Sequence, residues 1–209
     1  MDLTTKRVLS QTNLSTAGQG LYAGYADAMP AADGNTYVVG SYVSNIIRVT
    51  PSRELSTFYV QHPLGPPREY GYTGLANLGN FLIANDNPSG QLVKFDVRDN
   101  QGTPVVIPQD PYHKFSTSNM MDFPSKYRNT ILLAAENQAE STDAQWDSAE
   151  FLGFIPSVVK GTFATAARQM ADRIYIVALP LDGETIYVSG HSSEFLLQDI
   201  TDALDTVLK

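Results

Sequence analysis

The feature that most constrains the fold is a strand-like pattern that recurs about every 47 residues along the chain. Each copy opens with a segment of small residues, and a β-branched or aromatic run follows it after a turn of Gly, Asn or Asp. The four opening segments are Tyr25–Met29, Tyr72–Ala76, Ser118–Asp122 and Thr165–Met170. A repeat of this length with several strands per copy is typical of the blades of a β-propeller.

The runs after each opening segment have the length of strands in an antiparallel meander, about six residues each. We therefore predict an all-β fold, a β-propeller of four-stranded antiparallel blades whose innermost strands are the opening segments. Crowding around a central axis favours small residues there. The other expected strands are Thr36–Ser41, Asn45–Thr50, Leu55–Val60, Phe81–Asn85, Gln91–Asp96, Thr103–Ile107, Thr130–Ala135, Glu150–Phe154 and Arg173–Ala178.

Two segments also allow a helix. The stretch Phe163–Ala171 consists of good helix formers, but the repeat assigns its centre to an inner strand, and tertiary context often overrides propensity. We follow the repeat and expect a strand. Near the end of the sequence, apolar residues recur at a three-to-four spacing, which predicts a short amphipathic helix over Ile200–Leu208 with Asp199 as its cap. These residues are Leu196, Leu197, Ile200, Leu204 and Leu208.

The number of copies is low for a closed ring. Lys6–Thr12 reads as the outer strand of a preceding blade, so the sequence holds about four blades and one extra strand, where closed propellers have roughly four to eight blades. An unusually small propeller is one interpretation. We favour the other, in which residues 1–209 form a single, partial propeller domain from the C-terminal part of a larger ring. An open ring exposes a sheet edge, which predicts self-association.

Composition excludes several classes of function. The sequence has 14 Lys and Arg against 22 Asp and Glu, a formal net charge of −8, which opposes binding to nucleic acid. It has no Cys, which excludes thiol catalysis and zinc–thiolate sites. No apolar run is long enough to span a membrane. No signal peptide is visible after Met1, so the compartment stays open: cytoplasmic if Met1 is the native start, secreted in a fuller form.

No motif specific to catalysis is present. The three histidines, His62, His113 and His191, have no partner four residues away, and we expect each to lie in a solvated loop. The nucleophile-elbow pattern Gly-x-Ser-x-Gly is absent, because Glu194 stands where its second Gly belongs. There is no phosphate-binding loop of the Walker type. The sequence therefore favours a protein that binds over one that catalyses.

Several blocks of sequence together carry a resemblance that covers nearly the whole chain. They are Tyr25–Met29, Ala31–Tyr42, Ser44–Val49, Gly65–Leu75, Ala84–Asn87, Ile131–Asn137 and Arg168–Met170. These blocks resemble one fungal family, the trichothecene biosynthesis cluster protein 14 family, which includes the Malassezia β-propeller allergens. The resemblance implies a six-bladed propeller, distantly similar to gluconolactonase and strictosidine-synthase propellers, from which this chain lacks about the first two blades. It also implies a secretion signal in many members.

Polar residues in or directly after the inner strands are the candidate ligand contacts of the central channel. Arg168 would direct its donors into the channel, or else form a structural ion pair with Asp122 or Glu136. Lactonase-like propellers hold a divalent cation such as Ca²⁺ at this place with oxygen ligands, and the alternative is that these Asp and Asn residues stabilise turns and strand ends. The channel candidates are Asp27, Asn85, Asn119, Glu136 and Arg168.

The resemblance implies a role in fungal virulence or secondary metabolism without an assigned reaction, and binding of a small apolar or lipid ligand at the axis. We therefore expect a non-enzymatic ligand-binding propeller that needs no cofactor. Two alternatives stay open. One is a metal-dependent hydrolase of the lactonase or esterase type, with a water activated by the cation. The other is a protein-interaction scaffold that uses a propeller face or the open sheet edge.

Overall fold

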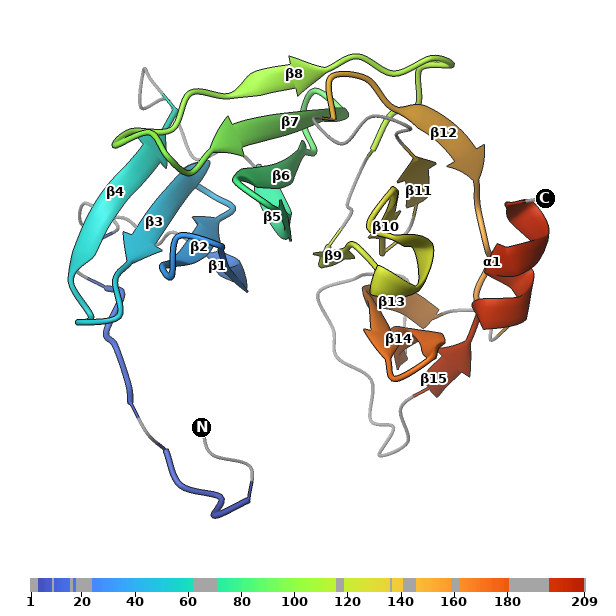
Figure 1. The fold of residues 1–209 in the computed structure, drawn as a ribbon, viewed down its shortest axis with the longest axis horizontal. Coiled ribbons are helices and arrows are strands. Elements are labelled where there is room, and N and C mark those ends of the chain that lie inside the picture. Colours follow the sequence, from blue (N-terminus) through green and yellow to red (C-terminus); the bar gives the residue numbers. More distant parts are fainter. Residues whose placement is uncertain are drawn as a thin grey trace.

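The computed structural model describes residues 4–8, 10–15, 17, 24–61, 71–115, 119–135, 137–140, 146–158, 162–180 and 196–208. They form four antiparallel sheets, which we number as blades 1 to 4 in chain order, and each sheet runs from its first to its last strand in sequence order (Figure 1). Blades 1 to 3 have four strands, and three strands are described in blade 4.

The elements follow one another in a simple meander. Blade 1 contains β1 (Tyr25–Pro30), β2 (Thr36–Gly40), β3 (Asn45–Val49) and β4 (Leu55–Val60). Blade 2 contains β5 (Tyr72–Leu78), β6 (Phe81–Asp86), β7 (Gln91–Asp96) and β8 (Val105–Ile107). Blade 3 contains β9 (Met121–Asp122), the short 3₁₀ turn η1 (Ser125–Tyr127), β10 (Ile131–Ala134), β11 (Asn137–Glu140) and β12 (Glu150–Gly153). Blade 4 contains β13 (Thr162–Met170), β14 (Arg173–Pro180), β15 (Leu196–Asp199) and then helix α1 (Thr201–Val207).

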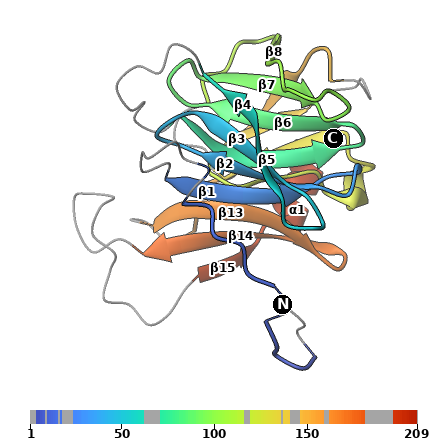
Figure 2. The ribbon, with the colours of Figure 1, turned by 90° about the vertical axis from the view of Figure 1, so that its left-hand side faces the viewer.

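The four blades follow an arc. The first strands β1, β5, β9 and β13 lie on its inner side, and the last strands lie on its outer rim (Figure 1). Each inner strand contacts the next one, β1 with β5, β5 with β9 and β9 with β13. Viewed from the side of blade 1, the N-terminal segment runs away from the sheets (Figure 2). This is the arrangement of a β-propeller, with its axis on the inner side of the arc.

The hydrophobic core is divided into three layers, each between two neighbouring blades. Side chains alternate between the two faces of a strand, so Leu82 and Ile83 of β6 enter different layers. The 1–2 core contains Met29, Tyr37, Val39, Ile46, Phe58, Tyr72, Leu75, Leu82, Ala84, Val93, Phe95 and Val97. The 2–3 core contains Ala76, Ile83, Leu92, Ile107, Phe115, Met121, Leu132, Ala134, Trp146 and Ala149. The 3–4 core contains Ile131, Leu133, Ala167, Ile174, Ile176, Ile200 and Leu204.

Helix α1 closes the outer end of the 3–4 core. Asp199 precedes it and accepts hydrogen bonds from the backbone N–H of Thr201 at 2.9 Å and from the Thr201 hydroxyl at 2.6 Å. The Thr201 hydroxyl oxygen in turn accepts the N–H of Ile174 on β14 at 2.8 Å. Leu204 is fully buried on the inner face of the helix. The helix is thus fixed to blade 4 at its first turn, to the 3–4 core by Leu204 and Leu208, and to η1 by the bonds of Asp205 with Lys126 and Tyr127.

The predicted all-β propeller fold with a short C-terminal helix is confirmed, and so are its four inner strands. The segment around Phe163–Ala171 is a strand, β13, as the repeat predicted and against its helix propensity. The prediction of an outer strand over Lys6–Thr12 is wrong. Among the described residues of this segment, Lys6 lies in a turn, Arg7 is an isolated bridge residue, and the others have no regular structure. The strands β11 and β15 were not predicted. Within the described residues, no helix is long and apolar enough to cross a membrane.

Candidate functional site

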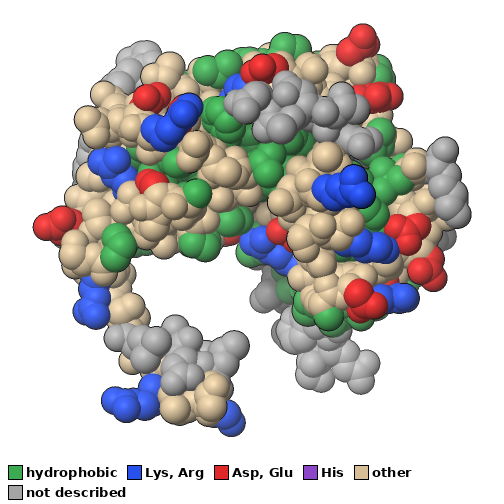
Figure 3. Space-filling view, in the orientation of Figure 1, with side chains coloured by type: hydrophobic (Ala, Val, Ile, Leu, Met, Phe, Trp, Pro, Cys, Tyr) green, Lys and Arg blue, Asp and Glu red, His purple; other side chains and the backbone are tan. Residues whose placement is uncertain are grey.

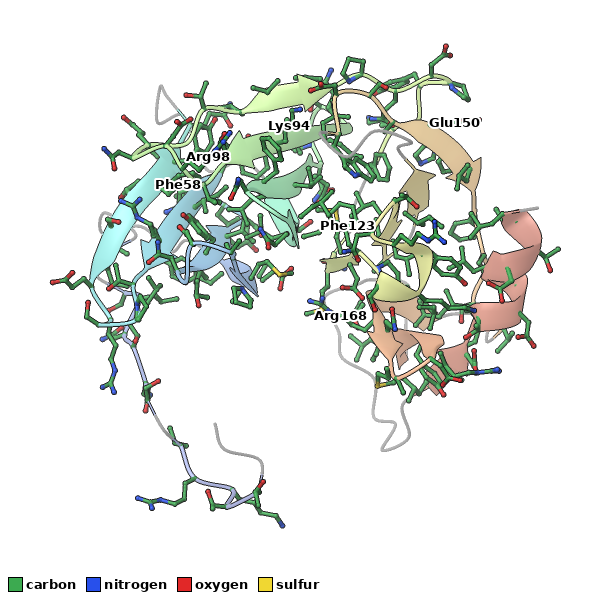
Figure 4. The ribbon with its side chains drawn as sticks, viewed as in Figure 1. Phe58, Lys94, Arg98, Phe123, Glu150 and Arg168 are labelled. Carbon is green, nitrogen blue, oxygen red and sulfur yellow. The ribbon has the colours of Figure 1, made fainter. Side chains whose placement is uncertain are left out.

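The inner strands bring three of the predicted channel residues to one place. Asp27 lies on β1, Asn119 two residues before β9, and Arg168 on β13. In Figure 4, Arg168 lies on the inner side of the arc, beside the space that separates blade 4 from blade 1. The space-filling view shows that this space is open at the surface and that basic and acidic side chains lie next to each other at its inner end (Figure 3). We call this region the axial site.

Asp27 is a buried carboxylate that joins blade 1 to blade 2. Asp27 is only 7% exposed. Its two carboxylate oxygens accept hydrogen bonds from the backbone N–H of Ala28 at 2.8 Å and of Leu75 at 3.0 Å. Burial raises the pKa of Asp27 above its ordinary value, while the N–H groups of Leu75 and Ala28 and the charge of Arg168 act in the opposite direction. Asp27 therefore fastens two inner strands together and also lies within electrostatic reach of blade 4.

Asp122 makes the same connection between blades 3 and 4. One of its oxygens accepts the backbone N–H of Gln169 on β13 at 3.0 Å, and the other accepts Nη1 of Arg168 at 2.9 Å. In both pairs, an inner-strand aspartate binds a main-chain N–H that lies 48 or 47 residues further along the chain. We call each of these contacts an inter-blade clamp. They hold successive inner strands at a fixed spacing around the axis.

Arg168 is held by two neighbouring side chains, but not all of its N–H donors are bonded to them. Its Nε donates to the thioether sulfur of Met120 at 3.2 Å, and its Nη1 donates to Asp122. Its side chain is 33% exposed. Two donors of the guanidinium are thus bonded to neighbouring side chains, while part of the Arg168 side chain stays exposed. The structural ion pair that the sequence left open is present, with Asp122 as the partner.

Blades 2 and 3 approach each other through backbone. A Cβ atom on Gly74 of β5 would lie 2.1 Å from the carbonyl oxygen of Asn119, so a side chain at position 74 would force the two strands apart. Glycine is required at this point by the close approach of a neighbouring main chain. Asn119 is half-buried at the same place.

Asn85, the next predicted channel residue, lies inside a buried hydrogen-bond network. Its Oδ1 accepts the N–H of Gly74 at 3.0 Å, and its Nδ2 donates to Thr73 Oγ1 at 3.1 Å and to Asn87 Oδ1 at 2.7 Å. The residue has no accessible surface. The first of these bonds satisfies the main-chain N–H of Gly74 at the β-bulge between Tyr72 and Leu75, where β5 departs from regular pairing with β6. Asn85 supports the inner strand from behind.

Glu136, the remaining predicted channel residue, lies outside the described residues. Among those that are described, no group of three or more His, Asp or Glu side chains is close enough together to hold a metal ion. The predicted cation and the hydrolysis that depends on it stay predictions. His113 differs from the expected solvated loop residue, because it is half-buried and its ring stacks on Phe151, with centroids 3.9 Å apart.

Sequence reasoning missed the two clamps as a pair. The sequence predicts Asp122 only as an ion-pair partner of Arg168, and it predicts no role for Met120. The signal was available in the repeat, because Asp27 and Asp122 both lie in the opening segments of their copies, in the first and third blade. The donor of each clamp is a main-chain N–H, which leaves no trace in the sequence. Only the meeting of two inner strands in space reveals it.

Comparison with known proteins agrees with this architecture. No family model matches the chain. Trichothecene biosynthesis protein 14 of Trichoderma arundinaceum is 59% identical over the whole of this chain, and core trichothecene cluster protein 14 of Fusarium sporotrichioides is 54% identical over the same extent. The chain spans 60% and 58% of the length of these relatives. It is thus a close homologue of both proteins, and the resemblance stated from the sequence is confirmed.

Solved structures support the fold. The major Malassezia sympodialis allergen Mala s 1 aligns with a TM-score of 0.61 at 23% identity, over 75% of this chain and 50% of the allergen. A streptogramin B lyase aligns with a TM-score of 0.52 at 13% identity, over 86% of this chain and 63% of the lyase. At these identities the likeness concerns the fold and not the chemistry of the site.

Proposed function

We propose that the protein binds a small, largely apolar molecule or lipid at the axial site and serves secondary metabolism of the trichothecene type without catalysing a reaction. The observation that carries this proposal is Arg168. It is anchored by Asp122 and Met120 at the inner side of the arc, yet a third of its side chain remains exposed there. A charged group that is held rigidly and left partly accessible at the axis of a propeller suits the recognition of a ligand.

The names of the two curated relatives support the choice of ligand class. Both refer to trichothecenes, one to their biosynthesis and the other to the core gene cluster. We therefore propose a trichothecene or an intermediate of its biosynthesis as the occupant, and a contribution to fungal virulence as the wider role. Because this chain spans about three fifths of each relative, the proposal concerns the axial site that these four blades form.

The proposal is tested by direct binding to the purified protein. Calorimetric titrations with a trichothecene and, in parallel, with a long-chain fatty acid are expected to give saturable binding to one of them. The change Asn119→Trp places a bulky ring where β5 and β9 meet and is expected to weaken binding at least tenfold. The matched control is Asn100→Trp in the exposed turn after β7, which should bind like the wild type. Absence of saturable binding for both ligands contradicts the proposal.

A protein-interaction role is the second candidate, because the outer edge of blade 2 is apolar and unpaired in the described residues. Strand β8 pairs with β7 alone, and its Val105 and Val106 are about half exposed. Edge strands of this kind pair with strands of another chain unless they are protected. If self-association occurs through this edge, Val106→Lys should shift the sedimentation coefficient of a concentrated sample toward the monomer, whereas Val158→Lys, on an exposed residue outside any strand, should not.

A further inference from the structure

The unused hydrogen-bond donors of Arg168 define what kind of group a ligand must present. A guanidinium carries five N–H donors and no acceptor. Nε donates one of them to Met120, and Nη1 donates one of its two to Asp122. The other three have no partner among the described residues. They belong to a side chain that is partly exposed at the axis, so they are available to an oxygen of a bound molecule.

The charges around Arg168 decide whether that oxygen belongs to an anion. Asp122 already neutralises the guanidinium through a direct ion pair. Asp27, the other carboxylate at the axis, is close enough that Arg168 affects its protonation. An anionic ligand would meet Arg168, whose charge Asp122 already compensates, and the carboxylate of Asp27. The negative charges of the ligand and of Asp27 would repel each other in this partly buried site. An uncharged acceptor meets no such opposition.

The surroundings of the donors combine apolar and polar groups. The thioether of Met120 lies against the guanidinium, and the fully buried Leu75, whose N–H is bound by Asp27, packs behind the axis in the 1–2 core. Asn119, two residues before β9, is half-buried. A few placed polar groups next to apolar ones are the usual composition of a site that orients a largely hydrophobic ligand.

We infer that the ligand of the axial site is an uncharged molecule with a carbonyl, ester or ether oxygen, and that this oxygen accepts hydrogen bonds from the free Nη groups of Arg168. The inference rests on the proposed function and deepens it, because it names the group that the site recognises. Arg168 acts here as a specificity-determining residue. Its ion pair with Asp122 serves to orient the guanidinium, and the ligand completes its hydrogen bonds.

Three probes that share one terpenoid carbon skeleton test the inference by equilibrium dialysis: methyl farnesoate, an uncharged ester; farnesoate, its anion; and farnesene, the hydrocarbon. The wild-type protein is expected to bind the ester roughly ten- to a hundredfold more tightly than the hydrocarbon, as one hydrogen bond to a charged donor provides. It should also bind the ester more tightly than the anion. Arg168→Met should remove the preference for the ester and leave binding of farnesene unchanged.

The matched control is Arg173→Met. Arg173 is also an exposed arginine paired with an aspartate on blade 4, but it lies at the start of β14 and bonds Asp199, away from the axial site. This variant should keep the wild-type preference. If Arg168→Met does not fold, the ranking of the three probes on the wild-type protein decides alone. Equal binding of ester and hydrocarbon, or tightest binding of the anion, overturns the inference and leaves the proposed function standing. Failure of all three probes to bind also overturns the inference, and the proposed function is overturned as well only if the trichothecene and the fatty acid fail to bind.

Discussion

The 1–2 core and the 3–4 core join neighbouring blades in the same way near the axis and in different ways toward the rim. Both have an inter-blade clamp, Asp27 to Leu75 in one and Asp122 to Gln169 in the other. Beyond the clamp, the 1–2 core contains four aromatic rings among aliphatic side chains, whereas the buried members of the 3–4 core are all aliphatic and helix α1 closes it. The spacing of the inner strands at the axis is therefore set by hydrogen bonds, whereas the side chains that fill the core further out differ between the two blade pairs.

The aromatic filling of the 1–2 core forms a continuous set of ring contacts. Phe58 meets Tyr37 edge-on with centroids 4.9 Å apart and lies 6.2 Å from Phe95, and Tyr59 lies 5.1 Å from Phe95. In Figure 4, Phe58 lies at the rim of blade 1, next to blade 2. The 3–4 core has no such set among its described members, and its outer end depends on Ile200 and Leu204. Where the filling is aliphatic, the clamp is reinforced by the ion pair of Arg168.

The largest effect is expected for Phe58→Ala in the 1–2 core. Phe58 is fully buried, and its ring also contacts the backbone at Gly102, where a Cβ would lie 2.5 Å from the ring. Loss of the ring should lower the free energy of unfolding by about 3 to 5 kcal/mol, measured by urea denaturation. The control Phe154→Ala removes an exposed ring and should cost less than about 0.5 kcal/mol. Similar losses for the two variants would show that the aromatic filling does not stabilise the first blades.

A somewhat smaller and more local effect is expected for Leu204→Ala in the 3–4 core. Leu204 is the fully buried residue of α1, and its loss should cost about 2 to 4 kcal/mol. Because α1 closes only this core, hydrogen exchange should accelerate in β14 and α1 while the amides of β2 and β6 keep their protection. Val207→Ala, on the exposed face of the same helix, serves as the control. Uniform loss of protection in all four blades would contradict the division into separate cores.

The two clamps should differ when each aspartate is replaced by asparagine. Asp27→Asn leaves one backbone N–H facing an amide N–H, at a cost of about 1 to 3 kcal/mol. Asp122→Asn has the same effect and also removes the charge that partners Arg168. We therefore expect the larger loss of thermal stability for Asp122→Asn. Equal losses would mean that the ion pair adds nothing to the second clamp, as is common for ion pairs at an exposed surface.

The smallest effect concerns pH and again separates the two regions. The Thr201 hydroxyl and N–H, followed by the Arg173 side chain, lower the pKa of Asp199 to about 2. A carboxyl whose pKa is lower in the folded protein stabilises the fold above its ordinary pKa near 3.8, and this contribution is lost as the pH falls through about 2. Unfolding of α1 should therefore become easier over this range, as followed by circular dichroism, and Asp199→Ala should abolish the dependence.

Asp27 should show the opposite sign. Its folded pKa is raised, mainly by burial, so the folded protein binds its proton at higher pH than the unfolded chain. Its contribution to stability therefore improves as the pH falls from its folded pKa to the ordinary value of 3.8. Carboxyl chemical shifts in an NMR titration should place the midpoint of Asp27 above 3.8 and that of Asp199 below it. The reverse order would contradict the buried environment assigned to Asp27.

The repeat made the inner strands predictable, because their small residues and the turns behind them recur at one spacing. The same pattern correctly assigned β13 in spite of its helix formers. The strand β15 was missed because Leu196 and Leu197 fit the three-to-four spacing of the helix that follows. The strand β11, with the sequence Asn-Gln-Ala-Glu, has no β-branched residue, so its conformation comes from pairing with β10 and β12.

The axial site was predictable in part. The register of the repeat placed Asp27 and Arg168 on inner strands, and the structure brings them within electrostatic reach of each other. The burial of Asn85 could not be foreseen, because it depends on the bulge in β5 and on hydrogen bonds to Thr73 and Asn87. The strand predicted over Lys6–Thr12 failed for a related reason. A strand needs a neighbour to pair with, and the pattern of one segment does not reveal whether it has one.

The clamps have a consequence for how a protein of this kind can diversify. Each one recognises a peptide N–H, at Leu75 and at Gln169, and makes no demand on the side chain attached to it. Substitutions that change the side chains at these two positions can therefore leave both clamps intact. The one residue that the arrangement forbids at positions 75 and 169 is proline, since it alone has no amide hydrogen to offer.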